Sequence, residues 1–419
     1  MKIQPPAQVA DIGLPHRPRV CFLYIAQAHQ VLHSLSVAIH LARTRPDLQV
    51  DVAATSEEVL DQARFMGAAM GEAPIRWRLA GPRWLRRLGR GGHGPPKLPM
   101  LAASARLLGG YDVIVTPERT TAAVRALGVR ARLVYTQHGA GDRAGPFEPR
   151  LRRFDLVFAA GTKQRDRMLA EGLVTPERCA VVGYPKFDLV DALQPNLPRL
   201  FADDRPVVFY NPHFSSKLGS WAAWGPRILQ AFAAQRRFNL IFAPHVRLFG
   251  GADPRSIAAL APFVGQPGLH IDLGGTSASV DMTYVRAADV YLGDVSSQVY
   301  EFLRQPRPCL FLNAHGVSWR GDESYRHWTF GPVLDGADDV IAAVGDAQHS
   351  HAAYRPAQVD GFRYTFDLSG PSSSARAAEA IARLATPGCE TRPQRKTSTQ
   401  GDTAWPTALQ PPRNWPRSS

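Results

Sequence analysis

Short apolar runs alternate with helical patterns along most of the chain, and this alternation restricts the fold more than any other feature. Such runs recur between residues 20 and 182 and again between residues 207 and 313. The segments between them are long enough for helices and carry apolar residues three or four apart. Strands joined by such crossovers pair in parallel. The sequence therefore predicts an α/β fold built from βαβ units.

A polar, Pro-rich segment at residues 192–206 interrupts the alternation, and 419 residues exceed one comfortable hydrophobic core. We expect two doubly wound, Rossmann-like domains, an acceptor-side domain at 19–191 and a nucleotide-donor domain at 207–386. Residues 1–18 form an N-terminal extension in this division. Residues 387–419 lack periodicity and are expected to be disordered. Ligands of such sheets bind at the carboxyl ends of the strands, which predicts a site in the cleft between the domains.

The composition limits where in the cell the protein is expected and which partners it is expected to bind. No run approaches the ~20 apolar residues that span a bilayer, and the four cysteines have no metal-ligand spacing. The net charge is +13, and part of it lies in the basic segment from Arg76 to Lys97, which also contains Trp77 and Trp84. This mixture predicts contact with an anionic membrane surface, with a solvated basic loop as the alternative. No nucleic-acid-binding motif accompanies the charge. We expect a cytoplasmic protein, peripheral on the inner face of the plasma membrane.

The stretch 287–302 combines an apolar strand with a polar turn. The strand breaks at Gly293, and two hydroxyl side chains precede a predicted helix at 298–304. Helix N-termini favour anions, so Asp294, Ser296 and Ser297 are candidates to hold a phosphate group. An ordinary N-cap would use the same residue types. Glu301 lies further along the helix and would bind ribose hydroxyls or be a surface charge.

Histidines follow three other predicted strands. His138 stands in a Gly-rich turn, where an imidazole either acts as general base on a hydroxyl or ties down the loop. The second half supplies further donors and positive charge after its first two strands: His213, Ser215, His245 and Arg247. Such a set with few carboxylates suits a pyrophosphate better than a hydrolytic acid–base pair. No His-x-x-x-His beside a carboxylate indicates zinc, and no metal is expected.

Several of these motifs occur together in a known family. They are Gln137-His138-Gly139, Gly183-Tyr184-Pro185-Lys186-Phe187-Asp188, Asn211-Pro212-His213-Phe214, Pro244-His245 and the stretch 288–297. In order and spacing they resemble the CDP-glycerol glycerophosphotransferases, GT-B-fold polymerases and primases of teichoic-acid-type polymers, over roughly residues 110–315.

The resemblance implies a GT-B fold and a displacement that needs neither metal nor cofactor. It assigns His138 as the base that deprotonates the acceptor hydroxyl. His245 is a second catalytic candidate, and with Ser296 and Ser297 it would hold the donor pyrophosphate. Three residues are expected on the acceptor side: Gln137, Gly139 and Lys186.

The sequence departs from the family at Val295, where the family has Tyr, and after Pro212, where its Thr and Arg are missing. The expected function is transfer of a glycerophosphate or related polyol phosphate from a CDP-activated donor to a glycan or lipid-linked acceptor. A GT-B glycosyltransferase that uses a UDP-, GDP- or CMP-sugar is the first alternative. A UDP-GlcNAc 2-epimerase-like enzyme, which requires carboxylates around the sugar, is the second. A non-catalytic binding protein on the same scaffold is the third.

Overall fold

The computed structural model describes residues 17–25, 27–89, 94–143, 147–193, 197–249, 257–274 and 276–386. The predicted N-terminal extension up to residue 16 and the predicted disordered tail lie outside these ranges. No helix within them is both long and apolar enough to cross a bilayer.

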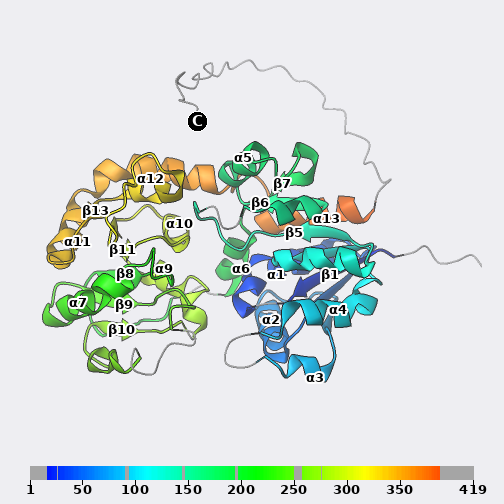
Figure 1. The fold of residues 1–419 in the computed structure, drawn as a ribbon, viewed down its shortest axis with the longest axis horizontal. Coiled ribbons are helices and arrows are strands. Elements are labelled where there is room, and N and C mark those ends of the chain that lie inside the picture. The colour runs from blue at the N-terminus through cyan, green and yellow to red at the C-terminus, as the bar shows by residue number, and fades with distance from the viewer. Residues whose placement is uncertain are drawn as a thin grey trace, which may run out of the picture. The chain divides into compact units, whose positions relative to one another are not determined.

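The N-terminal half contains a seven-stranded sheet in which every pairing is parallel, with the order β3-β2-β1-β4-β5-β6-β7. Figure 1 labels β1, β5, β6 and β7 of this sheet. Its strands are β1 (Arg19–Tyr24), β2 (Gln49–Ala54), β3 (Ile75–Leu79), β4 (Val113–Thr116), β5 (Arg132–Tyr135), β6 (Leu156–Ala159) and β7 (Cys179–Val181). The predicted parallel α/β architecture is confirmed. Strand β3 was not predicted, because its apolar residues alternate with arginines inside the basic segment.

The helices of this half are η1 (Ala28–His33), α1 (Leu35–Thr44), α2 (Glu57–Ala69), α3 (Arg83–Arg86), α4 (Lys97–Leu108), η2 (Arg119–Leu127), η3 (Pro149–Arg153), α5 (Thr162–Ala170), η4 (Pro176–Arg178) and α6 (Pro185–Leu193). The helical segment after β1 is divided at Ser34 into η1 and α1, and the Ser34 hydroxyl lies 2.9 Å from the Tyr24 hydroxyl. Helix α2 starts at a Ser56 N-cap that accepts a hydrogen bond from the Val59 amide.

The C-terminal half contains a six-stranded parallel sheet with the order β10-β9-β8-β11-β12-β13. Its strands are β8 (Val207–Asn211), β9 (Asn239–Phe242), β10 (Leu269–Ile271), β11 (Val290–Gly293), β12 (Cys309–Leu312) and β13 (Val333–Leu334). Its helices are α7 (Trp221–Ala234), η5 (Ala261–Phe263), η6 (Ser277–Ser279), α9 (Thr283–Ala287), α10 (Gln298–Phe302), η7 (Glu323–Phe330), α11 (Val340–His349) and α12 (His351–Thr365).

The last helix, α13 (Ser373–Ala385), follows the second sheet in the chain but packs against α1, α6 and β4 of the first half. Its buried face is made of small and branched residues, among them Ala377, Ala378 and Ile381, which belong to the hydrophobic core around β1 and β2. The predicted boundaries assigned residues 373–386 to the donor domain. The structure places this helix in the first half because its narrow apolar stripe fits the face of α1.

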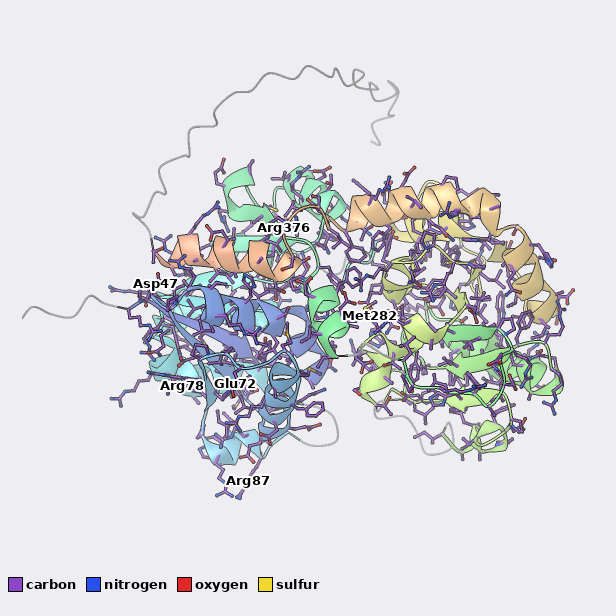
Figure 2. The ribbon with its side chains drawn as sticks, turned by 180° about the vertical axis from the view of Figure 1, so that it is seen from behind. Asp47, Glu72, Arg78, Arg87, Met282 and Arg376 are labelled. Atoms are coloured by element: carbon purple, nitrogen blue, oxygen red, sulfur yellow. The ribbon has the colours of Figure 1, made fainter. Side chains whose placement is uncertain are left out.

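The basic segment from Arg76 to Lys97 is partly folded into the N-terminal half. Arg78 on β3, which is labelled in Figure 2, forms an ion pair of 2.6 Å with Asp51. Asp51 is a buried carboxylate on β2. Lys97 at the start of α4 pairs with Glu118 at 2.6 Å. Two charges in the described part of this segment therefore have internal partners, which a fully solvated loop would not provide.

Candidate functional site

A pocket lies where the carboxyl ends of strands from both sheets meet. The residues that line it are His29, Leu32, His33, His138, Tyr184 and Lys186 from the first half, and His245, Val246, Val280, Ser296, Ser297, Gln298 and Glu301 from the second. It offers about 100 Å³ to water-sized groups. Pockets for whole drug-sized ligands are typically ~300–1,000 Å³, so this space suits a phosphate-sized group. The pocket brings together six of the predicted site residues.

His138 follows β5, and its ring is held through one nitrogen. Nδ1 lies 2.9 Å from the carbonyl oxygen of Pro117, which can only accept, so Nδ1 carries the proton. Burial, followed by the charge of Arg119, lowers the pKa of His138 below its usual value. A neutral ring with a protonated Nδ1 has an unprotonated Nε2. The ring therefore ties down its loop with one nitrogen and retains the other as a base.

His213 and His245 have the opposite arrangement. Nδ1 of His213 accepts from the Ser215 amide at 3.1 Å, and Nδ1 of His245 accepts from the Arg247 amide at 3.2 Å. Burial, then His245, lowers the pKa of His213 to about 3. Burial, then Arg247, lowers the pKa of His245 to about 4. In both neutral rings the proton is on Nε2, so these side chains are hydrogen-bond donors.

The side chains of Ser215 and Arg247 do not belong to the described lining of the pocket. The Ser215 hydroxyl accepts from the Lys217 amide at 3.4 Å, and the Arg247 guanidinium lies 4.1 Å from the centre of the Phe214 ring. Their direct contact with a donor stays a prediction. Their backbone amides set the tautomers of the two histidines, which is a supporting role.

Asp294 also has a role different from the predicted one. Its buried carboxylate accepts from the His213 amide at 2.9 Å, the Ser220 amide at 2.6 Å and the Ser220 hydroxyl at 2.8 Å. Burial raises the pKa of this carboxyl group. The side chain fastens the loop after β8 to the turn after β11 and does not line the pocket in the described structure.

The turn after β11 presents Ser296 and Ser297 to the pocket at the start of α10. Helix α10 ends at Phe302 and has only five residues, which is shorter than predicted. Anion binding at this turn therefore depends on side-chain and backbone donors and gains little from a helix dipole. The Ser296 hydroxyl accepts from the Gln298 amide at 3.3 Å.

The turn that carries His138 lies against Ser297. A Cβ atom added at Gly141 would be 3.1 Å from the Ser297 Cβ, whereas one at Gly139 would be 3.6 Å from the Ser297 hydroxyl. Glycine at 141 therefore allows the close approach of the two turns. Gln137 is buried and donates to the Met168 sulfur at 3.6 Å inside the first half, so its predicted acceptor-side contact is also revised.

Lys186 and Glu301 were predicted on the acceptor and donor sides, and they form one ion pair across the pocket. The Lys186 ammonium lies 2.8 Å from each carboxylate oxygen, and the Tyr184 hydroxyl donates to Oε1 at 2.8 Å. Both side chains are buried. Glu301 is thus engaged by protein groups and is not a surface charge, and its binding of ribose hydroxyls stays a prediction.

Sequence reasoning missed several residues at this site. His29 and His33 of η1 both line the pocket, although neither was among the candidate site residues. Burial, then the charge of His138, lowers the pKa of His29 to about 3. Asp142 directly follows Gly141, and this position next to the Gly-rich turn of His138 could have marked it as a site residue. His327 carried no signal, because it lies in a segment without recognised periodicity.

Metal binding has no support in the described part of the chain, where no group of three or more His, Cys, Asp or Glu side chains could hold an ion.

Two parallel sheets that meet at one pocket define the GT-B class of fold, and known structures support this assignment. The chain resembles the wall teichoic acid polymerase TagF, in a variant soaked with CDPG, with a TM-score of 0.59 and 12% identity over 88% of each chain. It also resembles the S. aureus MnaA–UDP complex, with a TM-score of 0.57 and 12% identity over 87% of this chain and 95% of that one. A UDP-GlcNAc 2-epimerase from Neisseria meningitidis, bound to UDP-GlcNAc, gives a TM-score of 0.52 and 11% identity over 87% and 99%. No family model and no curated protein sequence matches the chain.

Proposed function

We propose that this protein is a transferase that moves a polyol-phosphate group, of the glycerophosphate class, from a CDP-activated donor to a hydroxyl acceptor on a glycan or lipid-linked molecule. The observation that carries the proposal is the pairing of opposite histidine tautomers in one pocket. His138 has an unprotonated Nε2, and His245 has a protonated one. TagF, which has the same fold, is a polymerase studied with CDPG.

These groups suit a displacement at phosphorus. The acceptor hydroxyl transfers its proton to Nε2 of His138, and its oxygen forms a bond to the phosphorus of the transferred group. The bond from that phosphorus to the bridging pyrophosphate oxygen breaks, and CMP leaves. His245 and the hydroxyls of Ser296 and Ser297 donate hydrogen bonds to the phosphate oxygens as negative charge develops.

One feature of the pocket favours transfer over epimerisation. Among the described lining residues, Glu301 is the only carboxylate, and it is engaged by Lys186 and Tyr184. Epimerisation of a nucleotide sugar needs acid and base groups around the sugar ring. A pocket with donors, one histidine base and a neutralised carboxylate supplies the requirements of hydroxyl activation and pyrophosphate binding instead.

The test is to incubate the protein with CDP-glycerol, CDP-ribitol, and UDP-, GDP- and CMP-sugars, each with and without a lipid-linked acceptor. Chromatography would quantify the released nucleotide, and mass spectrometry would identify the product. CMP release with an acceptor that gains a polyol phosphate supports the proposal. Release of UDP or GDP would indicate glycosyl transfer. Conversion of UDP-GlcNAc without an acceptor would indicate epimerisation, and no turnover of any donor would refute an enzymatic role.

We also propose that the N-terminal half contacts an anionic membrane through the surface formed by α3 and the start of α4. Trp84, Leu88 and Leu98 are 66%, 58% and 57% exposed, although they are large apolar side chains. Arg87, which is next to Leu88 in the chain, points outward from the ribbon (Figure 2). Exposed Trp and Leu flanked by arginine suit the interface of an acidic bilayer.

Co-sedimentation with phosphatidylglycerol vesicles would test this surface. The variant Trp84→Ala/Leu88→Ala should bind at least tenfold more weakly, and neutral phosphatidylcholine vesicles should bind little of the natural protein. Leu127→Ala is the matched control, because Leu127 is an exposed leucine on η2. Equal binding by the double variant and the control would contradict the assignment.

A further inference from the structure

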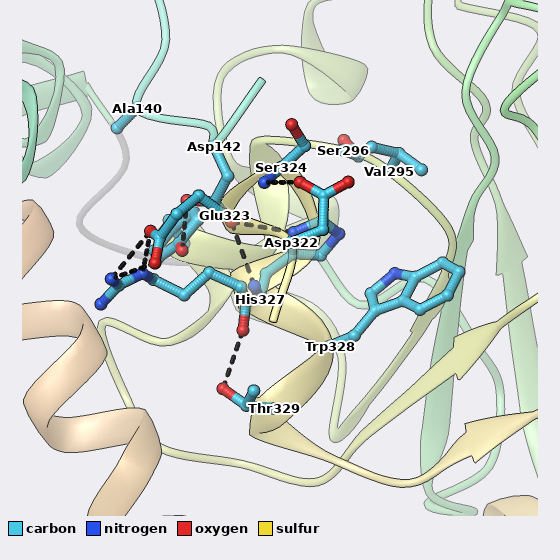
Figure 3. A network of polar contacts seen from close by, with 12 residues as sticks. Ala140, Asp142, Val295, Ser296, Asp322, Glu323, Ser324, His327, Trp328 and Thr329 are labelled. Atoms are coloured by element: carbon cyan, nitrogen blue, oxygen red, sulfur yellow. Dashed lines mark hydrogen bonds and ion pairs between the residues drawn. The ribbon is translucent and has the colours of Figure 1, made fainter. Parts of the chain in front are cut away.

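A buried polar network joins the two halves behind the pocket. The carboxylate of Asp142 accepts from the Lys163 ammonium at 2.7 Å and the Tyr300 hydroxyl at 2.6 Å. It also accepts from His327, at 3.0 Å from the backbone amide and 2.9 Å from Nδ1 (Figure 3). Asp142 and Lys163 come from the first half, and Tyr300 and His327 come from the second. The side chains of Asp142 and His327 are 2% and 3% exposed.

The ring of His327 lies between two acceptors. Nδ1 faces the Asp142 carboxylate, and Nε2 lies 2.9 Å from the carbonyl oxygen of Asp294. Neither acceptor can donate, so both ring nitrogens carry a proton. Lys163 and Asp142 form an ion pair. Burial lowers the pKa of Lys163 to about 8, and Asp142 counteracts that decrease.

Asp142 is an ionised carboxylate at the centre of the cluster. Burial by itself raises the pKa of Asp142, but Lys163 and the hydrogen bond from His327 outweigh it and hold the pKa low. The carboxylate of Asp142 contacts both Lys163 and the His327 ring. The carboxylate of Asp294 instead accepts from the His213 amide and from Ser220, and Asp294 meets the ring only through its backbone carbonyl.

The two acceptors of the His327 ring belong to the two turns that form the pocket. Asp142 lies in the turn that carries His138 and Gly141, and Asp294 begins the turn that carries Ser296. The indole of Trp328 donates to the same Asp294 carbonyl at 2.8 Å, so that turn has a second support within its own half. The histidine ring is therefore a direct bridge between the base and the hydroxyl groups.

We infer that His327 is a positioning residue of the transfer reaction, whose doubly protonated ring fixes the separation between the His138 turn and the Ser296–Ser297 turn. The inference rests on the proposed function for its kinetic test. Buried ion pairs add little net stability compared with apolar packing. We therefore expect the contact between His327 and Asp142 to hold the two turns at a fixed relative position rather than to stabilise the fold. A misplacement of about 1 Å in such a site is enough to lower a rate ~10²-fold.

The kinetic test replaces His327 by Gln, which can donate to one acceptor but not to both. We expect kcat to fall ~10–100-fold, while the dissociation constant of the nucleotide donor changes less than ~3-fold, because Trp328 still holds the donor turn. His349→Gln, at an exposed histidine at the end of α11, is the matched control. Tyr300→Phe removes another bond to Asp142 and should lower kcat in the same sense.

A spectroscopic test does not depend on turnover. In the full chain labelled with ¹⁵N-histidine, one ring at neutral pH should show two slowly exchanging N–H protons, and this signal should vanish in His327→Gln. If no donor is turned over, the proposed function fails, and the spectrum still decides the state of the ring. If His327→Gln does not fold, Tyr300→Phe provides the kinetic result. Absence of the doubly protonated signal, or full kcat in these variants, would overturn the inference.

Discussion

The ion pair between Lys186 and Glu301 gives a prediction whose magnitude follows from burial. Lys186→Met removes the ammonium that contacts both oxygens of the Glu301 carboxylate, and it leaves the Tyr184 hydroxyl as the remaining donor among the contacts described above. The carboxylate is then uncompensated in a buried site. Breaking a buried pair from one side typically destabilises a protein by ~3–5 kcal/mol, and we expect a loss of that size.

Removal of both charges should cost much less. In Lys186→Met/Glu301→Gln, the amide oxygen of Gln still accepts from Tyr184, and no buried charge is left without a partner. We expect the double variant to be within ~1–2 kcal/mol of the natural protein, since the desolvation penalty of both ions is also removed. The two substitutions should therefore be strongly non-additive in a double-mutant cycle.

Urea unfolding followed by tryptophan fluorescence at pH 7 would measure these free energies. Arg304→Met is the matched control, because Arg304 and Asp191 form a bidentate pair with 2.7 Å contacts that is 35% and 49% exposed. A pair so accessible to water should contribute ~1 kcal/mol or less. If Lys186→Met is no more destabilising than Arg304→Met, or if the Lys186 and Glu301 substitutions are additive, the argument from burial is wrong.

Three further predictions concern the pocket itself. His138→Gln should lower kcat ~10²–10⁴-fold in the donor assay, and the acid limb of kcat/KM in the natural protein should lie below pH 6.5, because burial lowers the pKa of His138. Gly141→Ala should reduce kcat ~10-fold or more while Gly139→Ala stays near the natural rate, since the added methyl groups meet Ser297 at 3.1 and 3.6 Å. Thermal stability should fall as the pH drops from about 6.5 to 5, because histidines bind protons in the unfolded chain but stay neutral when they are buried in the folded protein. The pKa values of His29 and His245 are lowered to about 3 and 4, so each should reduce the free energy of unfolding by ~2 kcal/mol at pH 5. An unchanged melting temperature would refute this prediction.

Local patterns were sufficient to predict most of the fold. Buried strands such as β1, β8 and β11 are continuous apolar runs, because helices cover both faces of a parallel sheet. Strand β3 escaped notice because it lies at the sheet edge and needs apolar residues on one face only. Its Arg78 is neutralised by Asp51, a partner 27 residues away that no local pattern reveals.

The sequence predicted which strand ends meet at the candidate site, but it did not predict the orientation of their side chains. Strand ends showed that His138, His245, Ser296 and Ser297 would gather at one pocket, because carboxyl ends of parallel strands lie together. They did not show which side chains turn inward, so Asp294 was assigned to the donor rather than to its own loop. Contacts between the halves were also hidden, since Lys186 and Glu301 are separated by 115 residues.

The tautomers of the site histidines could be predicted from the sequence only where a neighbouring residue sets them. In His213 and His245 the tautomer is set locally, by the amide two residues further along, so a Pro-His turn after a strand already favours a hydrogen-bond donor. The tautomer of His138 is set by the carbonyl of Pro117, 21 residues earlier, which follows the neighbouring strand β4. Since an acceptor at Nδ1 leaves Nε2 unprotonated, and the Pro117 carbonyl is that acceptor, the base depends on the pairing of β4 with β5. The same residue type therefore becomes base or donor according to the backbone group that reaches its Nδ1.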